Sequence, residues 1–243
     1  MKITVSRQEL SAALLFASTD ESRYVLNGVL IECRTAGVSK PTLVATDGRR
    51  LAVIETIADQ DFDEREDRSL LLKADFIKPL CSLSKSLGGK NNPWIQFSNK
   101  AGSNQVRAVF VGSNCVVDVE DGALIEGQFP NWRQILPAKN SVRRPINDLG
   151  INSEMVGDFA KAAKIMESET PIIQMNLIGK EAAIEVRLCS LPSFYGLIMP
   201  CKADESIDYQ PEFLQVSKLF PPPKPDEEKP MVKSATEETG SDT

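Results

Sequence analysis

The residue types that most often carry catalysis or bind metals are scarce in this sequence. There is no histidine, which removes the commonest general base and the commonest ligand of transition metals. The cysteines are odd in number, scattered, and without a C-x-x-C pair, and they lie at Cys33, Cys81, Cys115, Cys189 and Cys201. We interpret them as reduced, structural residues. An enzyme that uses carboxylates or lysines would need titratable groups converging on a cleft, and we find no such set, so we expect no catalysis, cofactor or metal.

The charge of the chain is divided unevenly. Residues 1–203 carry 24 Lys and Arg against 24 Asp and Glu, whereas residues 204–243 carry 4 against 10. The net charge of -6 therefore lies in the tail, and the neutral body can still present a basic face. No apolar run approaches the roughly 20 residues of a membrane span, and the N-terminus does not have the pattern of a secretory signal. We therefore expect a cytoplasmic protein without membrane contact.

The elements that must position any site follow a pattern that occurs three times. Residues 2–5 alternate like a strand, and Ser6 and Glu9 have the spacing of a helix capping box. Strand-like runs at 24–33 and 42–54 follow, the second interrupted by a tight turn at Asp47-Gly48. A strand, a capped helix and several strands then recur from about residue 69 and again from about residue 148. This is an internal architectural repeat.

The repeat predicts the fold class. Helices with one apolar side, alternating with short strands, indicate an α+β fold in which antiparallel sheets carry helices on one face. Beyond residue 203 the pattern gives way to a stretch rich in proline and acidic residues. Such a segment buries too little apolar surface to offset its ordering entropy, so we expect residues 204–243 to be a disordered tail.

Three stretches resemble, in order, the beta subunit of bacterial DNA polymerase III, the DNA sliding clamp. The first comprises RYVLNGVL at 23–30 and ATDGRRLA at 45–52. FPNWRQILP at 129–137 is similar to the family's F-P-D-Y-R-R-V-L-P, and YGLIMPCK at 195–202 to its Y-V-V-M-P-M-R. The resemblance implies the DNA clamp fold, with a complete clamp domain at 1–137 (two repeat units) and a half domain at 138–203 (one unit). The family's first domain and half of its third have no counterpart here, which leaves ring closure open.

In this family a hydrophobic pocket between the middle and last domains binds partner peptides containing Gln and Leu or Phe. The resemblance implies that the pocket is lined here by Leu26, Thr46, Gly48, Arg49, Arg50, Leu51, Pro130, Gln134, Ile135, Leu197, Met199, Pro200, Cys201 and Lys202. The apolar members would form a cup and the polar ends of Thr46 and Arg50 would orient a peptide at its edge. Cys201 stands where the family often has methionine, which predicts a shallower cup.

The family contacts DNA through basic residues on helices of the inner ring surface, which bind phosphates without reading sequence. The corresponding candidates here are Arg7, Lys73, Lys78, Lys85, Lys90, Lys161 and Lys164. The tail adds Gln215 ahead of Leu219 and Phe220, which is similar to the motif that polymerases insert into the clamp pocket. One hypothesis is that this segment docks in the pocket of its own or a neighbouring chain; the alternative is a terminal strand that packs its apolar side.

These observations predict a processivity or recruitment factor for DNA replication or repair. We expect double-stranded DNA and a DNA polymerase or another clamp-binding protein as partners, with a homo-oligomer whose size, tetramer included, the sequence leaves open. The need for a clamp loader also stays open. The alternative is a decoy or adaptor that never encircles DNA and sequesters clamp-binding peptides. Either protein could be encoded by a phage or mobile element and act in the host cytoplasm.

Overall fold

The computed structural model describes residues 2–33, 40–58, 68–87, 94–99, 103–111, 116–138, 146, 149–170 and 172–202. Residues Met1–Ala203 form one compact unit, and residues Asp204–Thr243 belong to a second. The predicted DNA contact Lys90 and the tail motif Gln215, Leu219 and Phe220 lie outside the described residues.

Strands and helices follow the predicted threefold pattern, except that the strand predicted to open the third unit is absent from the described residues 149–152, where Gly150 makes only an isolated bridge. The first unit consists of β1 (Lys2–Ser6), α1 (Arg7–Leu14), a 3-10 helix η1 (Glu21–Leu26), β2 (Gly28–Cys33), β3 (Thr42–Thr46) and β4 (Arg50–Glu55). The second consists of β5 (Arg68–Lys73), α2 (Ala74–Leu87), β6 (Trp94–Asn99), β7 (Gln105–Val111) and β8 (Val116–Ala123). A 3-10 helix η2 (Trp132–Ile135) precedes the third, with α3 (Ser153–Ile165), β9 (Ile173–Asn176), β10 (Ile184–Leu188) and β11 (Phe194–Ile198).

The first two units exchange their opening strands. Strand β1 pairs with β6 of the second unit, giving a four-stranded sheet of order β1-β6-β7-β8. Strand β5 pairs in return with β2 of the first unit, over the six residue pairs from Gly28 opposite Lys73 to Cys33 opposite Arg68. Each sheet therefore contains strands of both units, and separating the units would break both ladders.

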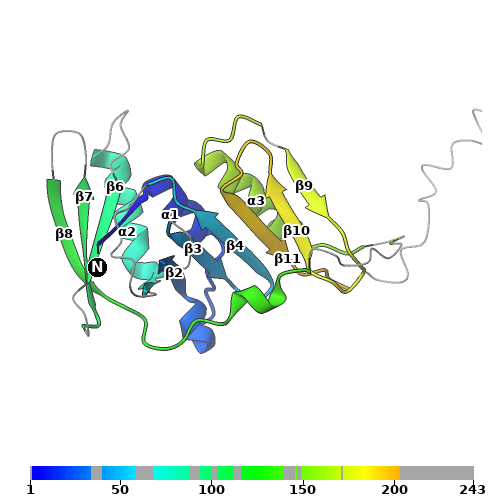
Figure 1. The fold of residues 1–243 in the computed structure, drawn as a ribbon, viewed down its shortest axis with the longest axis horizontal. Coiled ribbons are helices and arrows are strands. Elements are labelled where there is room, and N and C mark those ends of the chain that lie inside the picture. The colour runs from blue at the N-terminus through cyan, green and yellow to red at the C-terminus, as the bar shows by residue number, and fades with distance from the viewer. Residues whose placement is uncertain are drawn as a thin grey trace, which may run out of the picture. The chain divides into compact units, whose positions relative to one another are not determined.

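The third unit extends the other sheet. Strand β11 pairs antiparallel with β4 from Phe194 opposite Ile54 to Ile198 opposite Arg50. The result is a seven-stranded antiparallel sheet of order β5-β2-β3-β4-β11-β10-β9 (Figure 1). Among the described residues before α3 no strand is exchanged: Gly150 makes a single bridge to Cys201, which follows β11.

Successive side chains of a strand point to opposite faces of the sheet, so the apolar strand residues form two separate layers. One layer, the inner core, contains the buried sides of all three helices and strand residues such as Ile3, Ile31, Ile54, Phe97 and Ile198. The other, the outer cluster, lies on the opposite face of the seven-stranded sheet and consists of Leu26, Leu30, Val44, Leu51, Val53, Leu71, Ile125, Phe129, Trp132 and Leu197. The helices therefore cover only one face of this sheet.

The chain after β8 covers part of the other face. Residues 124–136 carry Ile125, Phe129, Trp132 and the partly buried Leu136 onto the outer cluster. Arg133 holds the segment in place, because its Nη1 lies 2.8 Å from the Glu32 carboxylate and its guanidinium lies over the Trp132 ring at 4.0 Å.

Local signals explain where the helices begin. The predicted capping box is present: the Ser6 hydroxyl accepts from the Glu9 amide at 3.1 Å, and the Glu9 carboxylate accepts from the Ser6 amide at 2.8 Å. Asn152 caps α3 through its side-chain oxygen. The strand predicted at 24–33 is wrong at its start, because Asp20 accepts from the Ser22 amide and begins η1, which extends to Leu26.

The predicted α+β class is confirmed: antiparallel sheets carry the helices on one face. Among the residues that the structure describes, no helix is long and apolar enough to cross a membrane.

Candidate functional site

The turn between β3 and β4 forms a polar tip fixed by its own side chains. The Thr46 hydroxyl donates to the Arg50 carbonyl at 2.6 Å and accepts from the Gly48 amide at 3.1 Å. The Asp47 carboxylate accepts from the backbone amides of Arg49 and Arg50 at 2.8 and 2.9 Å. Gly48 has φ +87°, a conformation that favours glycine. These bonds hold the turn in one conformation without a ligand.

An apolar surface lies beside this tip on the outer face. Leu51 of β4 stands opposite Leu197 of β11, and both belong to the outer cluster with Leu26. Met199 follows β11 and is held there by its amide, which donates to the Arg49 carbonyl at 2.8 Å. Its side chain is 41% exposed, and that of Ile135, beside Trp132 and Leu136, is 52% exposed. Large apolar side chains left this accessible are candidates for binding an apolar partner.

Most other predicted pocket residues are accessible groups. Gly48, Arg49, Pro130, Gln134, Cys201 and Lys202 are exposed, Pro200 is half-buried, and Thr46 is buried. Cys201 donates its amide to the Gly150 carbonyl at 2.8 Å, which ties the end of the β11 segment to the start of the third unit.

Arg50 departs from this arrangement. The alternation along β4 gives it the same face as Ala52 and Ile54, so its side chain points into the helix side of the sheet, away from Leu51. There its guanidinium binds the Asp47 carboxylate at 3.0 Å, the Asp158 carboxylate of α3, and the Leu15 carbonyl at 3.0 Å. It also lies 5.3 Å from the centre of the Phe16 ring. Arg50 thus connects the first unit to the third.

Asp158 is the residue that sequence reasoning missed. Burial alone would raise the pKa of this carboxyl, but hydrogen bonds from Arg50 and Lys161 outweigh it and hold the pKa below its usual value. The sequence did contain a sign of this role. Asp158 lies on the same side of α3 as the buried residues Met155, Phe159 and Ala162. An acidic residue within an apolar stripe indicates a basic partner.

The predicted DNA contacts are distributed over all three helices. Arg7 begins α1, Lys78 lies on α2, and Lys161 and Lys164 lie on α3. Two of these have acidic neighbours one turn away: Lys78 is 3.2 Å from Asp75, and Lys161 is 2.7 Å from Asp158. Lys85 belongs to α2 as well.

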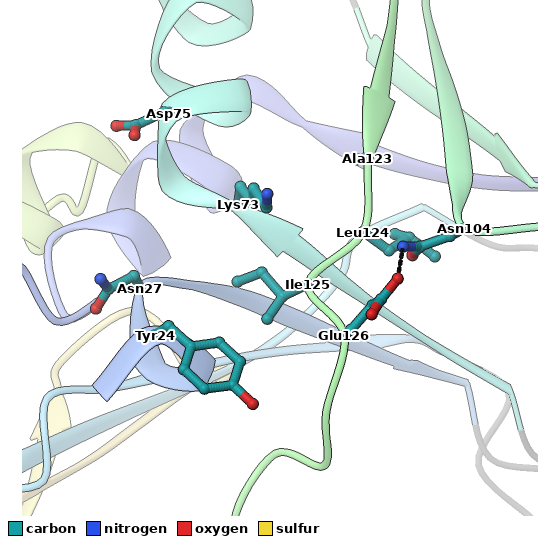
Figure 2. Close-up of a pocket in the computed structure, with 9 residues that line it drawn as sticks. All are labelled: Tyr24, Asn27, Lys73, Asp75, Asn104, Ala123, Leu124, Ile125 and Glu126. Carbon is teal, nitrogen blue, oxygen red and sulfur yellow. Dashed lines mark hydrogen bonds between the residues drawn. The ribbon is translucent and has the colours of Figure 1, made fainter. Parts of the chain in front are cut away.

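Lys73 is set apart from the other basic candidates. It ends β5 on the face of Leu71, and it lines a cavity of about 400 Å³ with Tyr24, Asn27, Asp75, Asn104 and residues 123–126 (Figure 2). An Asn104 to Glu126 hydrogen bond of 2.7 Å forms one wall. None of the predicted pocket residues lines this cavity.

The described cysteines are all free thiols: Cys33, Cys81, Cys189 and Cys201. Burial raises the pKa of Cys33 to about 12, and it also raises that of Cys81, so both are poor nucleophiles. Within the described ranges no three His, Cys, Asp or Glu side chains are grouped closely enough to hold a metal ion.

Comparisons with solved structures place this geometry in a known fold. The chain superimposes on the DNA polymerase sliding clamp of Pseudomonas aeruginosa with a TM-score of 0.60 and 14% identity, covering 84% of this chain and 66% of that one. The beta subunits of Thermotoga maritima and Borrelia burgdorferi also give 0.60, at 17% and 16% identity; 84% of this chain is covered in each case, with 66% and 65% of theirs. The chain thus spans slightly less than two thirds of these relatives.

Sequence comparison gives the family. No curated protein matches the chain. The family model of the DNA polymerase III beta subunit, central domain, matches residues 4–131, which include the first two units up to the segment that crosses the outer face. The chain therefore belongs to the family of the DNA polymerase III beta subunit.

Proposed function

We propose that this protein is a sliding clamp-like processivity or recruitment factor that docks peptide motifs of polymerase-type partners on the outer face of its seven-stranded sheet. The observation that carries the proposal is the apolar surface at the β4–β11 seam. Leu51 and Leu197 are buried in the outer cluster at this seam, and Met199, which follows β11, and Ile135 of η2 are exposed. Family membership and the clamp fold support the same reading.

The chemistry of the surface fits a short peptide with Leu or Phe and a Gln. The exposed methionine and isoleucine side chains offer contacts to the apolar residues of such a peptide, and the exposed tip residues Gly48 and Arg49 lie beside Met199 for its polar groups. Arg50 is occupied by Asp47 and Asp158. Thr46 is buried and its hydroxyl is occupied within the turn. We therefore assign the orienting role to the exposed tip residues Gly48 and Arg49 and give Thr46 and Arg50 a structural one.

We propose further that the helices bind the phosphates of double-stranded DNA without reading sequence. Lys78, Lys161 and Lys164 have exposed side chains on α2 and α3. Because Asp75 and Asp158 lie beside two of them, each contact is partly neutralised, and we expect weak binding that falls steeply with salt. A protein of this kind needs no catalytic step.

A peptide titration tests the docking surface. A fluorescent peptide with a Gln followed by Leu-Phe is titrated into the full chain and into Ile135→Glu, and its anisotropy is recorded. Placing a charge where an isoleucine would be buried should weaken binding at least about tenfold. Ile57→Glu is the matched control, because Ile57 is 64% exposed and lies outside the surface. Equal affinities for the two variants would refute the site.

The alternative is an adaptor that sequesters such peptides and never encircles DNA. The acidic neighbours of Lys78 and Lys161 support it, because they weaken contact with DNA phosphates. Light scattering after size exclusion distinguishes the clamp from the adaptor. A single oligomer with the mass expected of a closed ring favours the clamp, and a monomer at every concentration favours the adaptor. The domain limits 1–137 and 138–203, docking of Gln215, Leu219 and Phe220 in the pocket, and the identity of the partner stay predictions.

A further inference from the structure

The outer face of the seven-stranded sheet changes from apolar to polar at the third unit. Leu197 of β11 stands opposite Glu185 of β10. One row further along, Val53 of β4 stands opposite Tyr195 of β11, and the same register brings Arg187 of β10 beside Tyr195. These side chains share one face because alternate residues of a strand point the same way. Polar groups therefore begin one strand away from the apolar surface at the β4–β11 seam.

Hydrogen bonds occupy the Glu185 carboxylate. Its Oε1 accepts from the Tyr195 hydroxyl at 2.9 Å, and its Oε2 accepts from the Asn176 side-chain amide at 2.5 Å. Burial and the hydrogen bond with Glu185 raise the pKa of Tyr195, so its hydroxyl keeps its proton and continues to donate at neutral pH. The carboxylate two residues from Arg187 on the same face therefore has a neutral donor on each oxygen.

Arg187 keeps its charge accessible. Its side chain is exposed, and no carboxylate in the described part of the chain forms an ion pair with it. The guanidinium carbon lies 4.4 Å from the centre of the Tyr195 ring, a cation–π contact that restricts the side chain. A guanidinium held in this way can bind a carboxylate through two parallel hydrogen bonds. Arg187 is therefore a prepared site for an acidic side chain of a partner.

The spacing along the sheet relates Arg187 to the apolar surface. Met199 and Tyr195 are four residues apart, which corresponds to about 13 Å of extended chain, and Arg187 lies one strand to the side, about 5 Å away. An extended peptide bound at Met199 thus reaches Arg187 with a residue about four positions along. The tip residues Gly48 and Arg49 lie at the Met199 end, because the Met199 amide donates to the Arg49 carbonyl. With the Gln of the peptide at the tip, the residue that reaches Arg187 follows Leu-Phe.

We propose that Arg187 selects partner peptides that carry an acidic residue after Leu-Phe, by pairing with its carboxylate. This inference rests on the proposed docking surface and adds a preference that apolar contacts alone do not supply. Tyr195 is a positioning residue in this arrangement, since its ring supports the guanidinium and its hydroxyl keeps Glu185 occupied.

Three fluorescent peptides that differ in charge test the proposal. All contain Gln followed by Leu-Phe, and the third and fourth residues after Phe are Asp-Asp, Asn-Asn or Lys-Lys. Two positions are changed because neighbouring residues of an extended peptide face opposite ways. In anisotropy titrations the full chain should bind the Asp peptide about three- to fivefold more tightly than the Asn peptide, as an accessible charge pair allows, and the Lys peptide most weakly. The preference should fade at about 1 M salt.

Substitutions assign the preference to Arg187. Arg187→Gln should give the Asp and Asn peptides equal affinity while leaving that of the Asn peptide unchanged, and Arg187→Glu should favour the Lys peptide. Tyr195→Phe keeps the ring but frees the Glu185 carboxylate to pair with Arg187, so it should reduce the Asp preference about twofold. Arg107→Gln is the matched control, because Arg107 is exposed on β7 of the other sheet, and it should keep the wild-type preference.

The outcomes distinguish this inference from the proposed function. Equal binding of all three peptides, together with weaker binding by Ile135→Glu, would leave the docking surface standing and overturn selection by Arg187. A preference for the Asp peptide that survives Arg187→Gln would also overturn it and would assign the selection to another basic group, such as Arg49. If none of the three peptides binds the wild type, the docking surface itself is wrong and the inference fails with it.

Discussion

The first unit meets its two neighbours in different ways. With the second unit it exchanges strands, so that β1 and β5 each complete the other unit's sheet, and α1 packs on α2. With the third unit it shares the β4–β11 ladder without an exchange of strands, α1 packs on α3 as it does on α2, and the rest of that seam is made largely by side chains. Phe16, Phe159 and Phe194 form a cluster with ring centres 4.8 to 6.1 Å apart, and Arg50 reaches Asp158 across it.

This difference predicts how strongly the first unit is coupled to the second and to the third during unfolding. Exchanged strands put main-chain hydrogen bonds of both units in one ladder, so the first and second units should unfold together. A seam made of side chains beside a single ladder can be weakened by one substitution. We therefore expect the third unit to open independently when its seam is damaged.

The largest expected effect is that of Phe159→Ala. The ring is fully buried between Phe16 and Phe194, and its removal should cost about 3–5 kcal/mol of unfolding free energy, measured by urea denaturation. Hydrogen exchange should show β9–β11 losing protection while β1 and β6 keep theirs.

The matched control for this variant is Phe97→Ala, a fully buried ring of β6 in the strand-exchanged pair. It should destabilise the chain by a similar amount without freeing the third unit selectively. If both variants loosen all three units alike, the two seams do not differ in coupling.

Two glycines sharpen the same contrast. A Cβ at Gly28 would meet the Leu72 carbonyl oxygen at 2.0 Å, which is backbone of the exchanged β5 and cannot move without breaking the ladder. A Cβ at Gly196 would meet the Phe159 ring at 2.3 Å, a side chain that can shift. We expect Gly28→Ala to cost about 3 kcal/mol or more and Gly196→Ala about 1–2 kcal/mol, by thermal unfolding. The reverse order would show that the β2–β5 ladder yields more easily than the aromatic cluster.

How far the sequence predicts these features depends on the distance over which each acts. The capping box of Ser6 and Glu9 and the turn at Gly48 depend on residues at most a few positions apart, and local spacing was enough to predict them. The exchange of β1 and β5 involves residues about 90 and 40 positions apart, and no local pattern records it.

The candidate site shows the same limit. The resemblance indicated the outer-face residues that gather at the seam, Leu51, Leu197 and Met199 among them. It assigned Arg50 to the same group, although alternation along β4 puts Arg50 on the other face from Leu51. Its partner Asp158 lies 108 residues away, so only the three-dimensional fold identifies the pair.

A third prediction isolates the charged link across the seam. Arg50→Met keeps the aliphatic stem and removes the guanidinium, which leaves Asp158 with Lys161 alone. We expect a loss of about 2–3 kcal/mol, since the pair is largely buried with side-chain exposures of 12% and 17%. A double-mutant cycle with Asp158→Asn should give a coupling of about 1–2 kcal/mol. Additive losses would mean that the two residues act separately and that the aromatic rings alone hold the third unit.

The smallest effect concerns pH and follows from the lowered pKa of Asp158. Its value in the folded chain lies below the 3.8 of an ordinary aspartate, because bonds from Arg50 and Lys161 outweigh burial. The unfolded chain therefore takes up this proton first as pH falls, so the stabilisation is complete well above pH 3.8 and is lost as pH falls through the folded value. The wild type should accordingly be more stable than Asp158→Asn by about 1–2 kcal/mol near neutral pH, and the gap should shrink below pH 4. Urea denaturation of both proteins from pH 3 to 7 measures it. A gap that stays constant over this range would mean that Asp158 contributes through its shape and hydrogen bonding, with no net contribution from its charge, and the seam would then depend on packing alone.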